Sequence, residues 1–211
     1  MVIDIGDLQK ILDEFEKTAK ENKDYLIKLD SVLGDGDLGI TMVKAFKAAN
    51  EYIKDYNDDD IGKALQMVGM EIANNAAATM GTLIATGFMK GGKELKGKNE
   101  IGYDEAIIFA EYAIEGIKNR GKSDVGDKTL LDCLVPAFNQ FKSSYNENND
   151  FALALDKAVN EGEAAVEKTK EMKSNFGRAH YYGEDSIGHK DPGAAAVLLF
   201  LESLNDYIQN K

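Results

Sequence analysis

The sequence is poor in cysteine, proline and arginine, and it has no long apolar run. Its only cysteine, Cys133, has no partner for an internal disulfide, and its place among apolar residues in TLLDCLVPAF indicates a core position. No window approaches the 18 or so apolar residues that a membrane span needs. The first residues include no basic, apolar leader, so we expect no signal peptide. Together these absences predict a protein of the reducing cytoplasm.

Basic residues are in the minority. The chain has 25 Lys and Arg against 37 Asp and Glu, which gives a formal net charge of −12. Because nucleic acids and anionic membranes are usually bound by a basic face, we expect neither as a partner. Hydrophobic residues make up 44% of the 211 residues, which is enough for a packed core and argues against global disorder.

Strand-like alternation is also nearly absent, and apolar residues recur at helical spacing instead. In the first run Leu8, Ile11 and Leu12 form one apolar face. Asp60 and Asp150 are placed as N-caps of two later runs. The prediction is an all-α fold, an antiparallel up-and-down helical barrel or bundle of about eight helices, in a single domain over 1–211. The predicted amphipathic runs cover 4–22, 24–31, 39–56, 60–77, 82–96, 103–119, 129–146, 150–172 and 193–209.

The connections between these runs are of two alternating kinds. One kind is rich in glycine together with Asp, Thr, Arg or Lys, and it occurs at 33–39, 76–82, 120–129 and 175–193. The connections of the other kind, which alternate with these four, lack this combination of residues. Short connections make neighbouring helices antiparallel, so alternate connections lie at the same end of a bundle. We therefore predict that the four Gly-rich loops meet at one rim.

Three aspartates occur in and just before the first of these loops, in the segment LDSVLGDGDLGITM. They are Asp30, Asp35 and Asp37. Asp-Gly segments are often simple turns and helix caps. Clustered carboxylates also repel one another unless a cation lies between them, and hard oxygen ligands suit Mg²⁺ or Ca²⁺. An EF-hand does not fit, because the twelfth position counted from Asp35 is Phe46 and not Glu.

The other Gly-rich loops contain groups suited to phosphate. Both arginines of the chain, Arg120 and Arg178, adjoin glycine in these loops, and arginine is a bidentate phosphate ligand, although two surface arginines also arise by chance. Asp191 and Pro192 have the chemistry of a helix start, whose free N–H groups serve a cap or an anion equally well. GDKT at 126–129 lacks the spacing of a Walker A loop, and we reject that match.

An acidic protein that binds polyphosphate needs a positive counter-charge. Three carboxylates that hold two Mg²⁺ ions would supply it, because the metal then attracts the phosphates. The hypothesis from the residues alone is that the aspartates bind metal and the metal binds phosphate.

Three segments together resemble the nucleotide-binding L subunit of bacterial dihydroxyacetone kinases. They read LDSVLGDGDLGITM, RGKSDVGDKTLLDCLVPA and GRAHYYGEDSIGHKDPGAA, and the likeness covers nearly the whole chain. The resemblance implies a closed barrel of antiparallel helices with ADP or ATP held at one rim through two Mg²⁺ ions. It implies Asp30, Asp35 and Asp37 as metal ligands. The nucleotide-binding residues that it implies are Leu38, Gly39, Ile40, Thr41, Thr79, Met80, Gly121, Leu130, Arg178, Asp191, Pro192 and Gly193.

The same resemblance implies partners. In that family a separate K subunit binds the sugar covalently through a histidine, and the L subunit presents the γ-phosphate. In the phosphotransferase-system type, a phosphohistidine carrier, the M subunit, rephosphorylates the bound ADP in place. For this chain the resemblance implies a phosphotransferase without a catalytic base of its own. It also implies either a homodimer or a complex of two L with two K subunits.

Two positions depart from the family pattern. Leu38 occupies a position that is usually His, and AAATMGT replaces the usual GGASGP, which puts Met80 where a serine is usual. A methionine cannot donate a hydrogen bond to phosphate. Two alternatives therefore stay open. One is a non-enzymatic, nucleotide-sensing regulatory subunit on the same fold, and the other is a helical interaction module whose Asp loops only cap helices.

Overall fold

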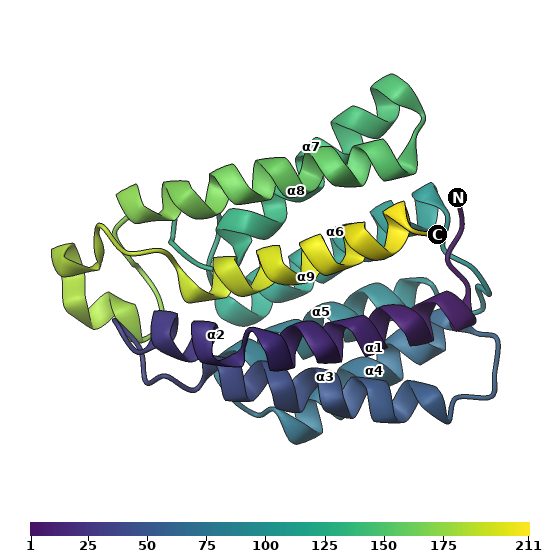
Figure 1. Ribbon diagram of the computed structural model, residues 1–211, viewed down its shortest axis with the longest axis horizontal. Helices are drawn as coiled ribbons and strands as arrows, with labels where there is room; N and C mark the ends of the chain where they lie inside the picture. The colour runs from purple at the N-terminus through teal and green to yellow at the C-terminus, as the bar shows by residue number, and fades with distance from the viewer. The chain divides into compact units, whose positions relative to one another are not determined.

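The computed structural model describes residues 1–211, and the chain is helical almost throughout (Figure 1). The α-helices are α1 (Ile5–Glu21), α2 (Lys23–Asp30), α3 (Leu38–Lys54), α4 (Ile61–Asn75), α5 (Thr79–Glu94), α6 (Tyr103–Gly121), α7 (Leu131–Asn148), α8 (Phe151–Lys168) and α9 (Pro192–Gln209). Two 3₁₀ helices, η1 (Thr169–Glu171) and η2 (Arg178–Ser186), lie between α8 and α9. The all-α prediction is confirmed, and each predicted run corresponds to one α-helix. No helix of the chain combines the length and apolar character that crossing a membrane requires.

The chain forms two compact units, which we describe one at a time. Unit 1 consists of Met1–Lys20 and Ile40–Gly121, and unit 2 consists of Glu21–Gly39 and Lys122–Lys211. A single functional domain over 1–211 stays a prediction.

Unit 1 is built on the amphipathic faces that the sequence predicts. Leu8, Ile11 and Leu12 of α1 are buried, as expected from their spacing. Phe46 of α3 is also buried and meets Phe15 edge to face, with ring centroids 5.3 Å apart. This arrangement removes the apolar stripe of each helix from water, which is the main stabilising term of such a core.

Helix α5 packs against both α4 and α6. A Cβ atom at Gly91 would lie 2.6 Å from the carbonyl oxygen of Phe109, so only glycine allows α6 to approach this closely. Gly87 lies against Ile117 in the same way, and the two pairs together show that α5 and α6 run antiparallel. The first residue of α5, Thr79, therefore lies at the same end of this helix pair as Gly121.

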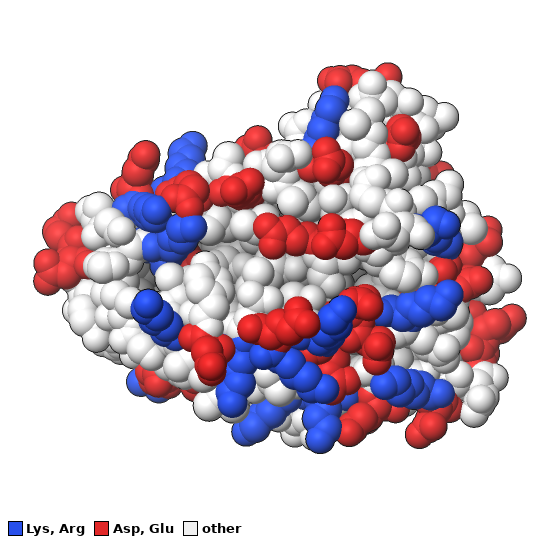
Figure 2. All heavy atoms as spheres, viewed as in Figure 1, with Lys and Arg blue, Asp and Glu red and all other residues white.

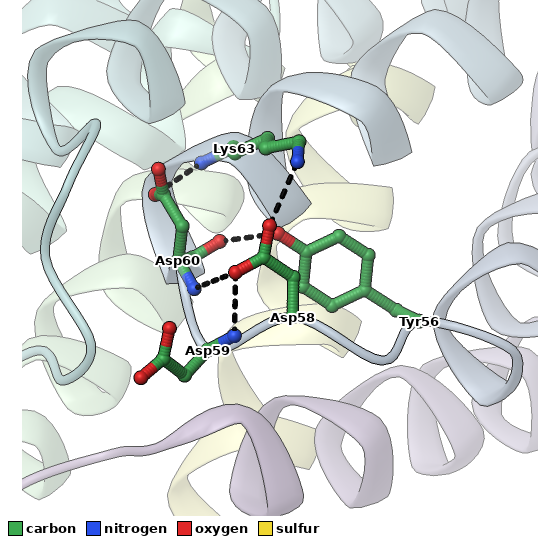
Figure 3. A network of polar contacts seen from close by, with 5 residues as sticks. All are labelled: Tyr56, Asp58, Asp59, Asp60 and Lys63. Carbon is green, nitrogen blue, oxygen red and sulfur yellow. Dashed lines mark hydrogen bonds and ion pairs between the residues drawn. The ribbon is translucent and has the colours of Figure 1, made fainter.

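The connection before α4 forms a polar network that starts the helix (Figure 3). The Asp60 carboxylate accepts the N–H of Lys63 at 2.8 Å, so Asp60 is the N-cap, as predicted. Asp58 accepts the Lys63 ammonium at 2.7 Å and the N–H of Asp59 at 2.9 Å, while the Tyr56 hydroxyl donates to the Asp60 carbonyl at 2.8 Å. An open hollow of about 750 Å³ lies beside this network. The side chains of Asp58, Asp60 and Lys63 are engaged in the contacts of this helix start, so we assign the loop a structural role.

In unit 2, α7 and α8 form an antiparallel pair with α9 beside it (Figure 1). Cys133 is fully buried in a cluster with Val166, Ala194 and Ala195, which confirms its predicted core position. Burial raises the pKa of the Cys133 thiol to about 12. Asp150 caps α8 by accepting the N–H of Leu153 at 3.0 Å, which is also as predicted.

The loops at one end of unit 2 are joined by direct contacts. The Arg178 guanidinium pairs with Asp35 at 2.6 Å, and the Asn175 side chain donates to the Asp127 carboxylate at 3.0 Å. The loops at 33–39 and 175–193 therefore meet each other, and the latter also meets the part of the 120–129 loop that belongs to unit 2. The predicted convergence is confirmed for these loops. The loop at 76–82 belongs to unit 1, and its place at a common rim stays a prediction.

Candidate metal and anion site

Three aspartates are brought together at the turn between α2 and α3. Asp30 is the last residue of α2, and Asp35 and Asp37 follow in the turn. One carboxylate oxygen from each lies within 4.8 Å of those of the other two; Asp30 is half-buried and the other two are exposed. Opposite ligands of an octahedral Mg²⁺ ion lie about 4.2 Å apart, given Mg–O distances of about 2.1 Å. The spacing and the hard oxygen donors therefore fit a divalent cation.

The turn has this shape because glycine occupies two of its positions. A Cβ atom at Gly34 would lie 2.2 Å from Oδ1 of Asp30, so any side chain there would push the carboxylate out of the cluster. Gly36 has φ of +71°, a conformation that side-chain-bearing residues rarely adopt. The Leu38 N–H donates to Oδ2 of Asp30 at 3.3 Å and orients that carboxylate from the start of α3.

Arg178 lies next to the aspartates. Its Nη2 is 2.6 Å from Oδ2 of Asp35, while the arginine side chain is 68% exposed. An ion pair this exposed contributes about 0–1 kcal/mol to stability, so little is lost when the guanidinium turns to another anion. The pair thus places a planar group with several N–H donors at the edge of the carboxylate cluster.

The start of α9 lies in the same unit. The Asp191 carboxylate accepts the N–H of Ala194 at 2.6 Å, which confirms Asp191 as the predicted N-cap, with Pro192 at the first helical position. Burial raises the pKa of the Asp191 carboxyl to about 7; the nearby Asp132 carboxylate adds to the rise, whereas the Ala194 N–H and the Lys128 ammonium oppose it. This helix start is therefore already capped by a buried acid.

Two further predicted residues lie against each other beside this helix start. A Cβ atom at Gly193 would lie 3.5 Å from the Cβ atom of Leu130 and 3.4 Å from its backbone nitrogen. The GDKT loop, by which we mean residues 122–130, thus reaches the first turn of α9.

The remaining predicted nucleotide-binding residues lie at helix ends. At the start of α3, Leu38 and Thr41 are buried, whereas Ile40 is 42% exposed. Gly39 packs on α2, since a Cβ atom there would lie 2.1 Å from the Lys23 carbonyl oxygen. Gly39 thus lets the start of α3 pack closely on α2.

Three further predicted residues lie in unit 1, to which Ile40 and Thr41 also belong. Thr79 and Met80 begin α5, whose N-cap residue Ala78 makes no side-chain hydrogen bond to the first turn. Thr79 is exposed and Met80 is half-buried, and Gly121 ends α6. An uncapped helix start with free N–H groups is compatible with anion binding.

The groups that hold these loops in place were not predicted from the sequence. The carboxylate of Asp132 accepts the N–H groups of Gly126 at 2.6 Å and Thr129 at 2.7 Å. Lys128 is 2% exposed, and its ammonium donates to backbone carbonyls of two other segments. Asp132 could have been noticed, because a charged residue within the apolar run TLLDCL is unusual. Nothing in the sequence marks Lys128 as buried.

The surface charge is mixed. On the face drawn in Figure 2, Lys and Arg side chains are interspersed with Asp and Glu and form no single basic face. With a net charge of −12, the chain offers an anion no general attraction. An anionic ligand therefore depends on local groups such as Arg178, or on a bound cation.

The DAK2 domain family matches residues 32–206 of the chain. The ADP-binding subunit DhaL of the PEP-dependent dihydroxyacetone kinase of Escherichia coli is 33% identical over 181 residues, which cover 86% of each chain. The DhaL subunit of the PEP-dependent dihydroxyacetone kinase 1 of Listeria innocua is 34% identical over 190 residues, which cover 90% of each chain.

A solved structure has the same fold. The dihydroxyacetone kinase of C. freundii, crystallised with AMP-PNP and Mg²⁺, superposes with a TM-score of 0.75 at 21% identity. The superposition covers 94% of this chain and 33% of that one, so this chain corresponds to about a third of the larger enzyme.

Proposed function

Because this chain belongs to the DAK2 domain family, we propose that it is the ADP- or ATP-binding subunit of a kinase for dihydroxyacetone or a related short sugar. One observation carries the proposal, namely the three carboxylates of Asp30, Asp35 and Asp37 within 4.8 Å of one another. The relatives, which are ADP-binding subunits of dihydroxyacetone kinases, support it.

In this proposal the aspartates hold two Mg²⁺ ions, which neutralise the charge of the nucleotide phosphates when bound. Arg178 exchanges its exposed pair with Asp35 for a phosphate oxygen. Leu130, which lies against the first turn of α9 at Gly193, contacts the nucleoside. The residues proposed to contact the nucleotide are Leu38, Gly39, Ile40, Thr41, Thr79, Met80, Gly121, Leu130, Arg178, Asp191, Pro192 and Gly193.

The chain has no catalytic base in this proposal, because the sugar is held by a partner. We propose a sugar-binding K subunit as that partner. The chain forms either a homodimer or a complex of two L and two K subunits. We place this assembly in the cytoplasm. The relatives are subunits of PEP-dependent kinases, which supports such an assembly. We propose a phosphohistidine M subunit as the phosphate donor to bound ADP.

A nucleotide-sensing subunit on the same fold is the second candidate. It is favoured by Leu38, which is 5% exposed, and by Met80, since neither side chain offers a polar group where the family pattern has one. Both candidates predict binding of Mg-ADP, and only the kinase subunit transfers a phosphoryl group.

The separating experiment mixes the chain with a sugar-binding K subunit and dihydroxyacetone, and follows formation of the sugar phosphate. Phosphate is supplied in one reaction as Mg-ATP and in a second as Mg-ADP with a phosphorylated M subunit, and product from either donor supports the kinase proposal. The kinase proposal predicts product with the wild-type chain and with Asp24→Asn, which removes an exposed carboxylate from the same unit. It predicts at least a tenfold lower rate with Asp35→Asn. Tight Mg-ADP binding without product would favour the sensor.

A further inference from the structure

Two segments of unit 2 contain residues proposed to contact the nucleotide, and neither is part of a long helix. The GDKT loop ends at Leu130, and the Arg178 segment, by which we mean residues 173–190, contains η2 and leads into the start of α9. Arg178 itself begins η2, which is kinked at Gly183, where φ is +56°. Such short, irregular segments need contacts from outside to keep one conformation.

Lys128 supplies contacts of this kind. Its ammonium donates to the Met172 carbonyl at 3.1 Å and to the Ser186 carbonyl, which lie at the two ends of the stretch that contains η2. The side chain is 2% exposed, and the backbone at Lys128 has φ of +60°, so both its burial and its conformation are unusual for lysine. Asp191 is the charged neighbour of this ammonium. One side chain thus contacts the stretch around η2 and lies beside the cap of α9.

The acceptors of Lys128 are themselves fixed. Ser186 is fully buried, and its hydroxyl accepts the N–H of Ser174 at 2.9 Å and donates to the Gly183 carbonyl at 2.6 Å. The neighbouring residue Asp127 contacts the same segment. Its carbonyl accepts the N–H of Asn175 at 3.2 Å, and its carboxylate accepts the Asn175 side chain at 3.0 Å. Adjacent residues of the GDKT loop therefore hold both ends of the stretch that carries Arg178.

We propose that Lys128 is a positioning residue, whose buried ammonium holds the Arg178 segment and the GDKT loop in the arrangement that receives the nucleotide. Lysine suits this role because its ammonium has three donors on one flexible stem. An apolar residue of the same length would leave the buried Ser186 carbonyl and the partly buried Met172 carbonyl without this donor. Lys128 touches no substrate in this account and acts through Arg178 and Leu130. The proposal rests on the proposed nucleotide site.

The test compares Lys128→Met with Lys122→Met, using the dissociation constant for Mg-ADP measured by calorimetry. Lys122 is a matched control, because it lies in the same loop with φ of +58° but is exposed. We expect Lys128→Met to weaken Mg-ADP binding at least tenfold and Lys122→Met to change it less than twofold. Lys128→Gln, which keeps an NH₂ donor on a shorter side chain, should give an intermediate value.

The readout is the affinity of folded protein, so a purely structural role would lower the melting temperature and leave the dissociation constant unchanged. Hydrogen exchange should also rise in 173–190 of Lys128→Met and stay at the wild-type rate in 31–37. An affinity within twofold of wild type in Lys128→Met would overturn the proposal. If Lys128→Met does not fold, wild-type affinity in Lys128→Gln would overturn it equally. Wild-type protein that binds no Mg-ADP would instead overturn the proposed function itself, and the role of Lys128 with it.

Discussion

At the scale of single residues, Asp191 shows how burial changes the chemistry of an ordinary helix cap. It is 9% exposed and shares its surroundings with Asp132 and Lys128. An exposed cap such as Asp150 makes the same bond to a backbone N–H without this cost of burial. The sequence predicts both caps from their positions, but it does not show which of them is buried.

Asp191→Asn should alter how stability depends on pH. The carboxyl pKa rises from an ordinary value of 3.8 to about 7 in the folded chain, so between these values the folded state keeps a proton that the unfolded state has lost. The free energy of unfolding contributed by this group therefore falls as pH rises towards 7, by about 2–3 kcal/mol between pH 5 and pH 8. Asparagine still caps the helix but does not ionise.

Urea unfolding at pH 5 and pH 8 measures this effect. Relative to wild type, Asp191→Asn should gain stability as the pH is raised. Asp150→Asn makes the same atomic change at an exposed cap and serves as the control. Parallel pH profiles for wild type and Asp191→Asn would contradict the assignment of a raised pKa.

At the scale of elements, amphipathic spacing predicts all of the α-helices, and local chemistry predicts some of their ends. Asp60 and Asp150 start α4 and α8 where expected. Helix α5 starts at Thr79, three residues before the predicted run, because Ala78 gives no capping signal in the sequence. The 3₁₀ helix η2 was not predicted. Its last residue, Ser186, is held by Lys128, which lies 58 residues earlier in the sequence.

Asp60→Ala should lower the free energy of unfolding by about 1 kcal/mol, because it removes the oxygen that caps the first turn of α4. Asp59→Ala is a close control. It removes the same charge from the adjacent position, and the Asp59 carboxylate makes none of the contacts in Figure 3. Chemical denaturation of the two variants gives the comparison, and equal stabilities would show that the cap contributes nothing.

At the scale of the whole molecule, the alternation of loop types predicts which loops carry the chemistry. Within unit 2 that inference holds for Asp35 and Arg178, which are far apart in sequence and 2.6 Å apart in space. The aspartate cluster was also predicted, because clustered carboxylates next to glycine are visible in the sequence. The buried ties through Lys128 and Asp132 were not, since burial of a charged residue depends on tertiary contacts.

The central claim is that Asp30, Asp35 and Asp37 bind the metal that binds the nucleotide. Thermal unfolding with ADP, in the presence and absence of Mg²⁺, tests it most directly on wild type, Asp35→Asn and Asp24→Asn. ADP at 100 times its dissociation constant should add about 2.7 kcal/mol of stability. For a chain of this size the melting temperature should rise by about 5–10 °C.

We predict this rise with Mg²⁺ in wild type and in Asp24→Asn, and its loss in Asp35→Asn or without Mg²⁺. No rise in wild-type protein shown to carry no nucleotide, or an equal rise in Asp35→Asn, would contradict the claim.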